Sequence, residues 1–422
     1  MSSEWPRYSV FQLQAEKKLL VEDGNHGEYR PRPNEFQDRG VSFIRAADMS
    51  DGRVLFNSAQ CINELARSRI RKGIGLPGDV LLSHKGTVGK VAYAPAGCPD
   101  FVCSPQTTFW RVMDERVLDR RFLFAYMQSA DFKAQLASRK GETDMADYVS
   151  LTAQRQLQIP VPGILLQREI GKVFSVLNDR ITLLRETNAT LEAIAQALFK
   201  SWFVDFDPVR AKAEGRQPDG MDAATAALFP DSFEESELGL MPKGWRVFRV
   251  EDLMELAYGK ALKATDRVDG QVPVYGSGGI TGYHDQSLLE GPGIIVGRKG
   301  TVGSLYWEDC PFFPIDTVFY VKAKKPLTYC YYLLRTLGLE GMNTDGAVPG
   351  LNRGNAYRLR AVVPPEAVLE GFDGVASRLR GRIFANAQQA QTLTQLRDIL
   401  LPRLISGQLR LPEAEALIEE AV

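Results

Sequence analysis

The sequence predicts two mixed α/β (α+β) domains, each followed by one long helix, with the two helices packed against each other as an antiparallel coiled coil. Three observations support this fold class. A segment occurs twice in the chain, a heptad pattern of apolar residues follows each occurrence, and an acidic stretch separates the two halves. A unit that recurs within one chain predicts a pseudo-twofold internal repeat.

The repeat is clearest in LLSHKGTVGKVAYAP (81–95) and IIVGRKGTVGSLYWE (294–308), which share the motif KGTVG. A second pair is LTAQRQLQIPVP (151–162) and LNRGNAYRLRAVVPP (351–365), and a weaker pair, WPRYSVFQL and MPKGWRVFRVEDL, opens the halves. We therefore expect each half to begin with a head of the same fold. Short alternating runs such as GDVLLSHKG predict strands of a curved antiparallel sheet in that head.

After each head, apolar residues recur in steps of four and three, which is typical of a helix with a coiled-coil seam. The predicted seam residues are Ile170, Phe174, Leu177, Ile181, Leu184, Leu191, Leu198, Phe372, Leu379, Ile383, Leu393, Leu400 and Leu404. A helix of about 35–40 residues is about 55–60 Å long, and an uncovered seam of that length would be insoluble. We therefore expect each helix to cover the other, antiparallel, with a head at each end.

Three polar residues interrupt the seam. At Arg397 the pattern slips, and Leu396 is expected to take its place. Asn188 and Asn386 are expected to cost stability while fixing the register of the two helices, as polar residues at such positions do in coiled coils.

These patterns divide the chain into six segments: a first head at 1–155, a spacer helix at 156–204, an acidic linker at 205–240, a second head at 241–360, a second spacer helix at 361–410 and an acidic tail at 411–422. The net charge of −1 argues against a protein that simply coats nucleic acid. Because the excess acidic groups lie in the linker and the tail, the heads and helices are mildly basic.

The cysteine and apolar patterns exclude several classes of protein. The five cysteines are scattered and never spaced as CxxC, which favours reduced thiols over a disulfide framework or a metal site. No run of about 18 apolar residues occurs, and the first residues lack the pattern of a secretory signal. We expect a cytoplasmic protein without a metal site or a membrane span.

The order of these segments, with ALFKSWFVDFDPV at 197–209, LPRLISGQL at 401–409 and one KGTVG in each head, resembles the specificity subunit of type I restriction-modification enzymes. The resemblance covers essentially the whole chain. It implies that the heads are target-recognition domains, each docking in the major groove of double-stranded DNA to read one half of a split site. The helices would set the unread gap between the halves.

The resemblance also implies partners and cofactors. Two modification subunits would bind the helices, carry S-adenosylmethionine and methylate adenine, and restriction subunits would use ATP and Mg²⁺. The chain itself would hold no cofactor and no catalytic residue.

Candidate DNA contacts lie in the KGTVG loops and in other loops that differ between the heads. In the first head they are Lys85, Thr87, Ser104, Gln106, Thr107, Arg139, Lys140, Asp144 and Tyr148. In the second head they are Tyr275, Ser277, Arg298, Lys299, Thr301, Asp316, Thr317, Asn343, Asn352 and Arg353. Because heads that read different sequences should differ at reading positions, the shared KGTVG residues are expected to shape a turn or clamp a phosphate rather than read bases.

Two further kinds of protein remain as alternatives. A duplicated-domain DNA methyltransferase is disfavoured, because the chain lacks the Asn/Asp-Pro-Pro-Tyr/Phe motif that grips a flipped adenine. A duplicated-domain nuclease is disfavoured, because the spacing of Pro99-Asp100 and Asp131-Phe132-Lys133 is too permissive to indicate a nuclease site. GRKGTVG lacks the Gly-Lys-Ser/Thr ending of a phosphate-binding loop. A coiled-coil scaffold that binds other proteins is the second alternative. The aromatic residues Phe199, Trp202, Phe203 and Phe206 are expected to lie in a core or a partner-binding surface rather than stack on bases.

Overall fold

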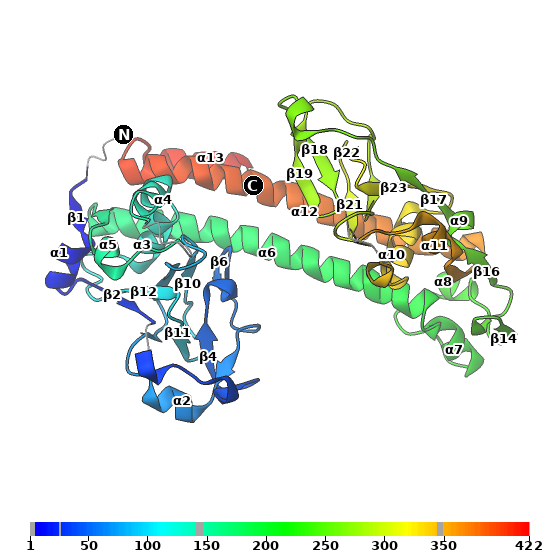
Figure 1. Ribbon diagram of the computed structural model, residues 1–422, viewed down its shortest axis with the longest axis horizontal. Helices are drawn as coiled ribbons and strands as arrows, with labels where there is room; N and C mark the ends of the chain where they lie inside the picture. The colour runs from blue at the N-terminus through cyan, green and yellow to red at the C-terminus, as the bar shows by residue number, and fades with distance from the viewer. Residues whose placement is uncertain (1–4, 25–26, 141–146, 344–348, 422) are drawn as a thin grey trace. The chain divides into compact units, whose positions relative to one another are not determined.

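The computed structural model describes residues 5–24, 27–140, 147–343 and 349–421. The chain forms two compact units, one of Met1–Leu184 with Gln388–Val422 and one of Arg185–Ala387. Each unit therefore contains one head and about half of each long helix, α6 (Ile164–Phe203) and α12 (Glu366–Ser406) (Figure 1). The two units are described separately.

The head of the first unit is a mixed α/β domain. Its strands are β1 (Arg7–Ser9), β2 (Leu19–Asp23), β3 (Phe36–Gln37), β4 (Val41–Ile44), β5 (Met49–Ser50), β6 (Gly52–Val54), β7 (Cys61–Ile62), β8 (Ile74–Gly75), β9 (Val80–Ser83), β10 (Val91–Tyr93), β11 (Phe101–Cys103), β12 (Thr107–Val112) and β13 (Gln158–Pro160). Its helices are α1 (Val10–Ala15), α2 (Glu64–Arg69), α3 (Arg120–Met127), α4 (Ala130–Ala137) and α5 (Leu151–Arg155). Side-chain oxygens of Ser9, Asn63, Asp119, Ser129 and Ser150 accept backbone N–H groups at the starts of these helices, as helix caps do.

The strands of this head form two main sheets, ordered β2-β12-β9-β10-β6-β5 and β3-β7-β4-β11-β8. Pairing is antiparallel except between β10 and β6 and between β11 and β4. Trp110 on β12 is fully buried and packs edge-on against Phe132 of α4, so the helices cover the apolar face of the larger sheet. The same core includes Ile170 and Phe174 of α6, which attach the head to the long helix.

The second unit repeats this plan with smaller sheets, ordered β17-β23-β20-β21 and β19-β18-β22. Its strands are β14 (Phe233–Ser236), β15 (Gly239–Pro242), β16 (Arg246–Arg249), β17 (Met254–Tyr258), β18 (Val272–Gly276), β19 (Gly279–His284), β20 (Gly293–Gly297), β21 (Leu305–Glu308), β22 (Phe313–Pro314), β23 (Val318–Ala323) and β24 (Arg360–Val363). Its shorter helices are α7 (Asp207–Ala213), α8 (Ala223–Ala227), α9 (Val250–Leu253), α10 (Leu327–Thr336) and α11 (Arg353–Arg358).

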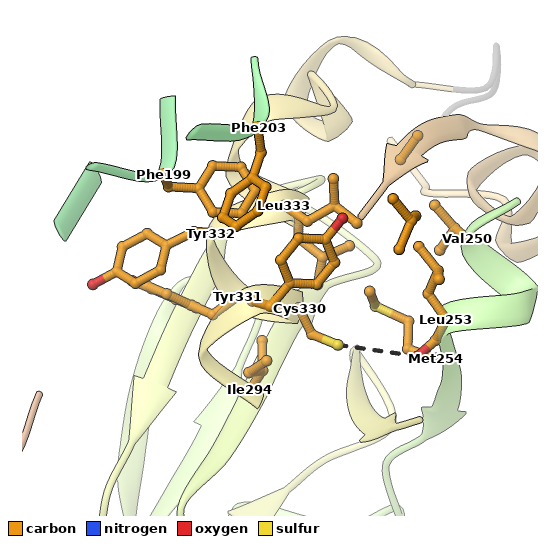
Figure 2. Close-up of a cluster of buried hydrophobic side chains, with 14 of the residues drawn as sticks. Phe199, Phe203, Val250, Leu253, Met254, Ile294, Cys330, Tyr331, Tyr332 and Leu333 are labelled. Carbon is orange, nitrogen blue, oxygen red and sulfur yellow. Dashed lines mark hydrogen bonds between the residues drawn. The ribbon is translucent and has the colours of Figure 1, made fainter. Parts of the chain in front are cut away.

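Aromatic residues near the end of α6 form part of the core of this second unit. Phe199 and Phe203 point toward Tyr332 and Leu333 of α10 (Figure 2), and both rings pack against Tyr329 and Phe372. Phe199, Trp202 and Phe203 are buried in this core, and Phe206 packs edge-on against Trp245. Of the two expected environments, core or partner-binding surface, the structure places Phe199, Trp202 and Phe203 in the core, and the half-buried Phe206 packs against it.

The opening and closing segments of each head pair with each other in the same way. β1 pairs antiparallel with β13, and β16 pairs antiparallel with β24. The backbone N–H of Val10 donates to Leu157 O at 2.9 Å, and that of Val250 donates to Leu359 O at 3.0 Å. The weak similarity between the two opening segments therefore marks a shared structural position.

Helices α6 and α12 pack side by side and antiparallel within each unit. In the first unit Leu177 and Ile181 share a buried cluster with Leu393. In the second unit Asn188 and Glu192 of α6 contact Ile383 and Arg380 of α12, so later residues of one helix meet earlier residues of the other. The predicted pair of antiparallel helices is confirmed.

None of the predicted seam residues is exposed. Those that are buried are Ile170, Phe174, Leu177, Ile181, Leu184, Phe372, Leu393, Leu400 and Leu404. Those that are half-buried are Leu191, Leu198, Leu379 and Ile383. At the slip, Leu396 packs against the first core, while Arg397 donates to Asn178 Oδ1 at 2.9 Å.

The acidic segments expected as a linker and a tail contain regular structure. Between 205 and 240 lie α7, α8, β14 and the first residues of β15, and Val209 and Phe229 are buried in the second core. Residues Leu411–Ala421 form α13, whose Leu411 and Ile418 pack against the helix pair in the first unit. The sequence did not predict this structure, because the two segments are mostly polar and only a few apolar residues anchor each one to a core.

Candidate nucleic-acid interface

The KGTVG loops have the same hydrogen-bonded frame in both heads. In the first head Gly86 N donates to Asp147 O at 2.9 Å, and Val149 N donates to His84 O at 2.9 Å. In the second head Gly300 N donates to Pro349 O at 3.1 Å, and Leu351 N donates to Arg298 O at 2.8 Å. In each head, therefore, the KGTVG loop pairs with residues at or just before the start of the second repeated segment.

The glycines of this frame shape its turn. Gly86 and Gly300 have φ of +78° and +86°, in the left-handed region that favours glycine. Lys85 and Thr87 in the first loop, and Lys299 and Thr301 in the second, are exposed on it. The loop thus presents a cation and a hydroxyl at equivalent places in both heads.

In the second head, side chains from three elements meet beside this loop. The guanidinium carbons of Arg298 and Arg353 lie 4.8 and 4.7 Å from the ring centroid of Tyr258, which is 49% exposed. Arg298 Nη1 also donates to Asp316 O at 2.9 Å. These residues border a recess of about 490 Å³, which is lined by Tyr258, Arg298, Lys299, Gly350, Leu351, Asn352, Arg353 and Gly354.

The first head carries different side chains at the equivalent places. Tyr258 ends β17 and pairs with Phe319 of β23, as Asp23 ends β2 and pairs with Thr108 of β12. The next residue is a glycine in both heads, Gly24 and Gly259, whose N–H donates to β12 and to β23 respectively. Asp23 is therefore the counterpart of Tyr258.

By the shared frame, His84 and Leu151 are the counterparts of Arg298 and Arg353. His84 is 2% exposed, its ring lies 5.5 Å from that of Tyr148, and its Nδ1 is 3.1 Å from Val149 O. Burial lowers the pKa of His84, so the ring is neutral at physiological pH. Where the second head has two arginines, the first has a neutral imidazole and an aliphatic side chain.

Other predicted contacts of the second head divide into exposed and supporting positions. Ser277 lies beside the KGTVG loop, where a Cβ at Gly300 would be 3.3 Å from Ser277 Oγ. Thr317 O accepts from the backbone of Arg298 and Lys299 and so supports the loop. Tyr275 faces the interior, where its hydroxyl donates to Glu308 at 2.8 Å, so it is not placed to read a base.

Two asparagines hold the segment that pairs with the loop. Asn343 Oδ1 accepts from Gly350 N at 3.0 Å, and Asn352 Oδ1 accepts from Asn355 N at 3.2 Å as the cap of α11. Asp316 is exposed and contributes its backbone oxygen to Arg298.

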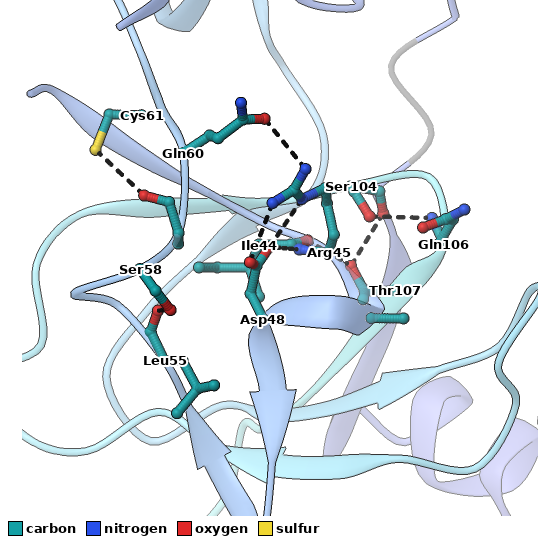
Figure 3. A network of polar contacts seen from close by, with 12 residues as sticks. Ile44, Arg45, Asp48, Leu55, Ser58, Gln60, Cys61, Ser104, Gln106 and Thr107 are labelled. Atoms are coloured by element: carbon teal, nitrogen blue, oxygen red, sulfur yellow. Dashed lines mark hydrogen bonds and ion pairs between the residues drawn. The ribbon is translucent and has the colours of Figure 1, made fainter. Parts of the chain in front are cut away.

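In the first head, Ser104 and Thr107 are also interior residues. They are 2% and 0% exposed, and Thr107 Oγ1 bonds to Ile44 O and Ser104 O within the network of Figure 3. Gln106 between them is exposed, and its carbonyl accepts from His84 N at 2.9 Å. Of these three residues, only Gln106 therefore has a side chain that faces solvent.

The remaining predicted residues lie near the loop that pairs with Lys85. Tyr148 forms a bridge with Lys85, and Lys140 makes an ion pair with Asp147 at 2.6 Å. Arg139 is half-buried and donates to Gln135 O and Gln156 O. Asp144 lies outside the described residues.

Sequence patterns missed Tyr258, Asp23 and His84. Tyr258 and Asp23 each stand directly before a glycine, at the ends of β17 and β2, and His84 stands before the repeated lysine. A position-by-position alignment of the two halves of the chain would have shown that the residue types at these positions differ between the heads, although the surrounding loop is the same.

Fold and site together define a duplicated binding protein with two heads that share a loop frame and differ in the side chains beside it. The chain belongs to the family of type I restriction modification DNA specificity domains, whose family model matches residues 26–193 and 242–354.

Individual relatives agree with that family, and one solved structure has the same fold. The chain is 25% identical to the "Type I restriction enzyme HindI specificity subunit" of Haemophilus influenzae, covering 87% of this chain and 94% of the relative. It is 23% identical to the MjaIX specificity subunit of Methanocaldococcus jannaschii, covering 78% and 79%. The crystal structure of the type I S subunit from M. genitalium shares the fold, with a TM-score of 0.60 at 17% identity over 95% and 96% of the two chains.

No described helix is both long and apolar enough to span a bilayer. No group of three or more His, Cys, Asp or Glu side chains in the described ranges could hold a metal ion.

Proposed function

We propose that this chain is the DNA-reading, non-catalytic subunit of a type I restriction-modification complex, and that each head reads one half of a bipartite double-stranded site. The observation that carries the proposal is one loop frame built twice, with the same exposed lysine and threonine but different neighbours. A shared cation suits the phosphate backbone, which is the same at every site, and differing neighbours suit bases, which are not.

The helix pair supports the division of the site into two halves. A spacer of two long helices would hold one binding unit for each half of the site, so the unread gap would follow from the length and register of the helices. The helices would also bind two modification subunits, which supply S-adenosylmethionine for adenine methylation, and restriction subunits would supply ATP-driven cleavage with Mg²⁺. This chain would contribute recognition alone, without a cofactor of its own, in the cytoplasm where the chromosome is accessible.

The test is to co-express the chain with its modification subunit and map methylated adenine across the host genome. A chimera takes residues 241–360 from another specificity subunit, and a matched chimera replaces residues 1–155. We expect a split motif in which each chimera changes a different half. A continuous motif, or one that neither chimera changes, would contradict the proposal and favour the scaffold alternative.

A second measurement addresses the enzyme alternative. The chain purified alone is incubated with DNA and S-adenosylmethionine, and separately with DNA and Mg²⁺. We expect neither methylation nor cleavage, and either activity would identify the chain as a duplicated-domain methyltransferase or nuclease.

A further inference from the structure

The largest chemical difference between the heads lies at three equivalent positions beside the shared loop. The second head has Tyr258, Arg298 and Arg353 there, and the first has Asp23, His84 and Leu151. We propose that Arg353, supported by Arg298, reads a guanine in the second half of the DNA site. This inference rests on the proposed function and adds the base and the residues that select it.

The comparison between heads separates base contacts from phosphate contacts. Lys85 and Lys299 occupy the same place in the two frames, so they suit a group present at every site. Arg353 has no cationic counterpart in the first head, where Leu151 packs partly buried against the core. A cation that only one of two equivalent heads possesses is placed to discriminate between sequences.

The geometry of Arg353 suits a planar acceptor pair. Its guanidinium lies over the ring of Tyr258 at 4.7 Å and near that of Tyr357 at 5.7 Å. Stacking on an aromatic face orients the guanidinium plane and leaves the N–H edge available. Guanine presents O6 and N7 side by side in the major groove, and a bidentate arginine is the commonest specific contact to them.

Among the residues that the structure describes, none takes up the donors of Arg353. Across the described ranges it has stacking contacts but no hydrogen bond or ion pair. Arg298 differs, because Nη1 is held by Asp316 O, which fixes that side chain beside Tyr258. Arg298 is therefore the positioning partner, and Arg353 is the group with free donors.

The recess is lined by positively charged side chains, which suits a ligand group that accepts hydrogen bonds. Its described lining contains Arg298, Arg353 and Lys299 but no carboxylate. In the first head the equivalent place offers the carboxyl-bearing Asp23 and a buried, neutral His84. The first head is therefore expected to select its half-site without an arginine at this place.

The experiment uses the full chain co-expressed with its modification subunit, with methylated adenine mapped genome-wide. Arg353→Lys keeps the positive charge but lacks the planar fork, so a phosphate contact survives it and a bidentate base contact does not. We expect sites that lack one guanine of the second half-site to become methylated, with selectivity at that base falling about tenfold or more and the first half unchanged. Arg298→Lys should give a smaller loss at the same base.

The matched control is Lys299→Ala, which should lower methylation at all sites alike and reduce the salt dependence of DNA binding without changing the motif. Thermal unfolding of each variant shows that the second head remains folded. If Arg353→Lys leaves a split motif unchanged, or if the second half-site contains no guanine, the inference is wrong while the proposed function stands. If the wild-type motif is not split, both are overturned.

Discussion

The asparagine pair between α6 and α12 allows a quantitative test of the coiled-coil packing. Asn386 Nδ2 donates to Asn188 Oδ1 at 2.9 Å, and Asn188 Nδ2 donates to Ile383 O at 2.9 Å. Asn386 is 2% exposed, whereas Asn188 is only half-buried. The two single substitutions should therefore differ in cost.

Asn188→Leu leaves the amide of Asn386 buried without its partner, so it should lower the free energy of unfolding by about 1–3 kcal/mol. Asn386→Leu leaves Asn188 bonded to Ile383 O and within reach of water, so we expect a loss of about 1 kcal/mol. The double variant removes both polar groups and replaces them with apolar side chains of similar size. It should be close to wild type or more stable, as apolar replacements at coiled-coil seams are.

The assay is equilibrium urea unfolding of the full chain, followed by far-ultraviolet circular dichroism, for the wild type, both single variants and the double variant. We expect the double variant to be more stable than Asn188→Leu alone. The loss in the double variant is then smaller than the sum of the two single losses by about 1 kcal/mol or more, and this difference is the coupling energy of the pair. A double variant that loses the sum of the two single losses would refute it, because the two side chains would then be energetically independent.

Three more predictions concern stability. Arg380 is buried, donates to Glu192 at 2.9 Å and lies over the Trp307 ring at 4.6 Å. Because the half-buried Glu192 keeps Arg335 at 3.5 Å and the Tyr332 hydroxyl at 3.2 Å, Arg380→Met should cost about 1–3 kcal/mol in urea unfolding. Glu192→Gln, which keeps a hydrogen-bond acceptor, should cost less, and equal losses would contradict the ion pair. Burial lowers the pKa of His84, so the unfolded chain takes up its proton first. The first unit should therefore lose stability as the pH falls from about 6.5 toward the lower folded-state pKa, and His84→Gln should reduce that slope in thermal melts. A Cβ at Gly374 or Gly381 of α12 would meet nothing within 4 Å. Alanine at either site should therefore raise the free energy of unfolding by about 0.5–1 kcal/mol. A decrease would show that the site is not an open helical position.

The repeat, the helices and their seam could be predicted from the sequence because each is a periodic signal. KGTVG recurs in similar surroundings, and apolar residues recur at heptad steps in two stretches, Ile170 to Leu198 and Phe372 to Leu404. Such patterns depend on local spacing and on covering an apolar stripe, so they need no knowledge of long-range contacts. Asn188 and Asn386 could also be recognised in the sequence as polar breaks in the seam, but the sequence did not show that their side chains bond to each other.

The site was predicted only in part. Arg298 and Arg353 were among the candidate contacts, but nothing in their spacing showed that they share the ring of Tyr258. Ser104 and Thr107 looked equivalent to Gln106, and only burial separates them. Composition likewise described 205–240 as an acidic linker, although Phe229 within it belongs to the second core.

The sequence by itself determined that there are two equivalent heads, two long helices and one shared loop motif, since periodicity and repetition are properties of the chain order. Only the tertiary structure decided which side chains stand beside that motif in each head. Tyr258, Arg298 and Arg353 come from three segments that are far apart in the chain and meet because strand pairing brings β17, the KGTVG loop and the start of α11 together. Contacts of that kind are set by hydrogen-bond register between distant strands, which no local pattern encodes.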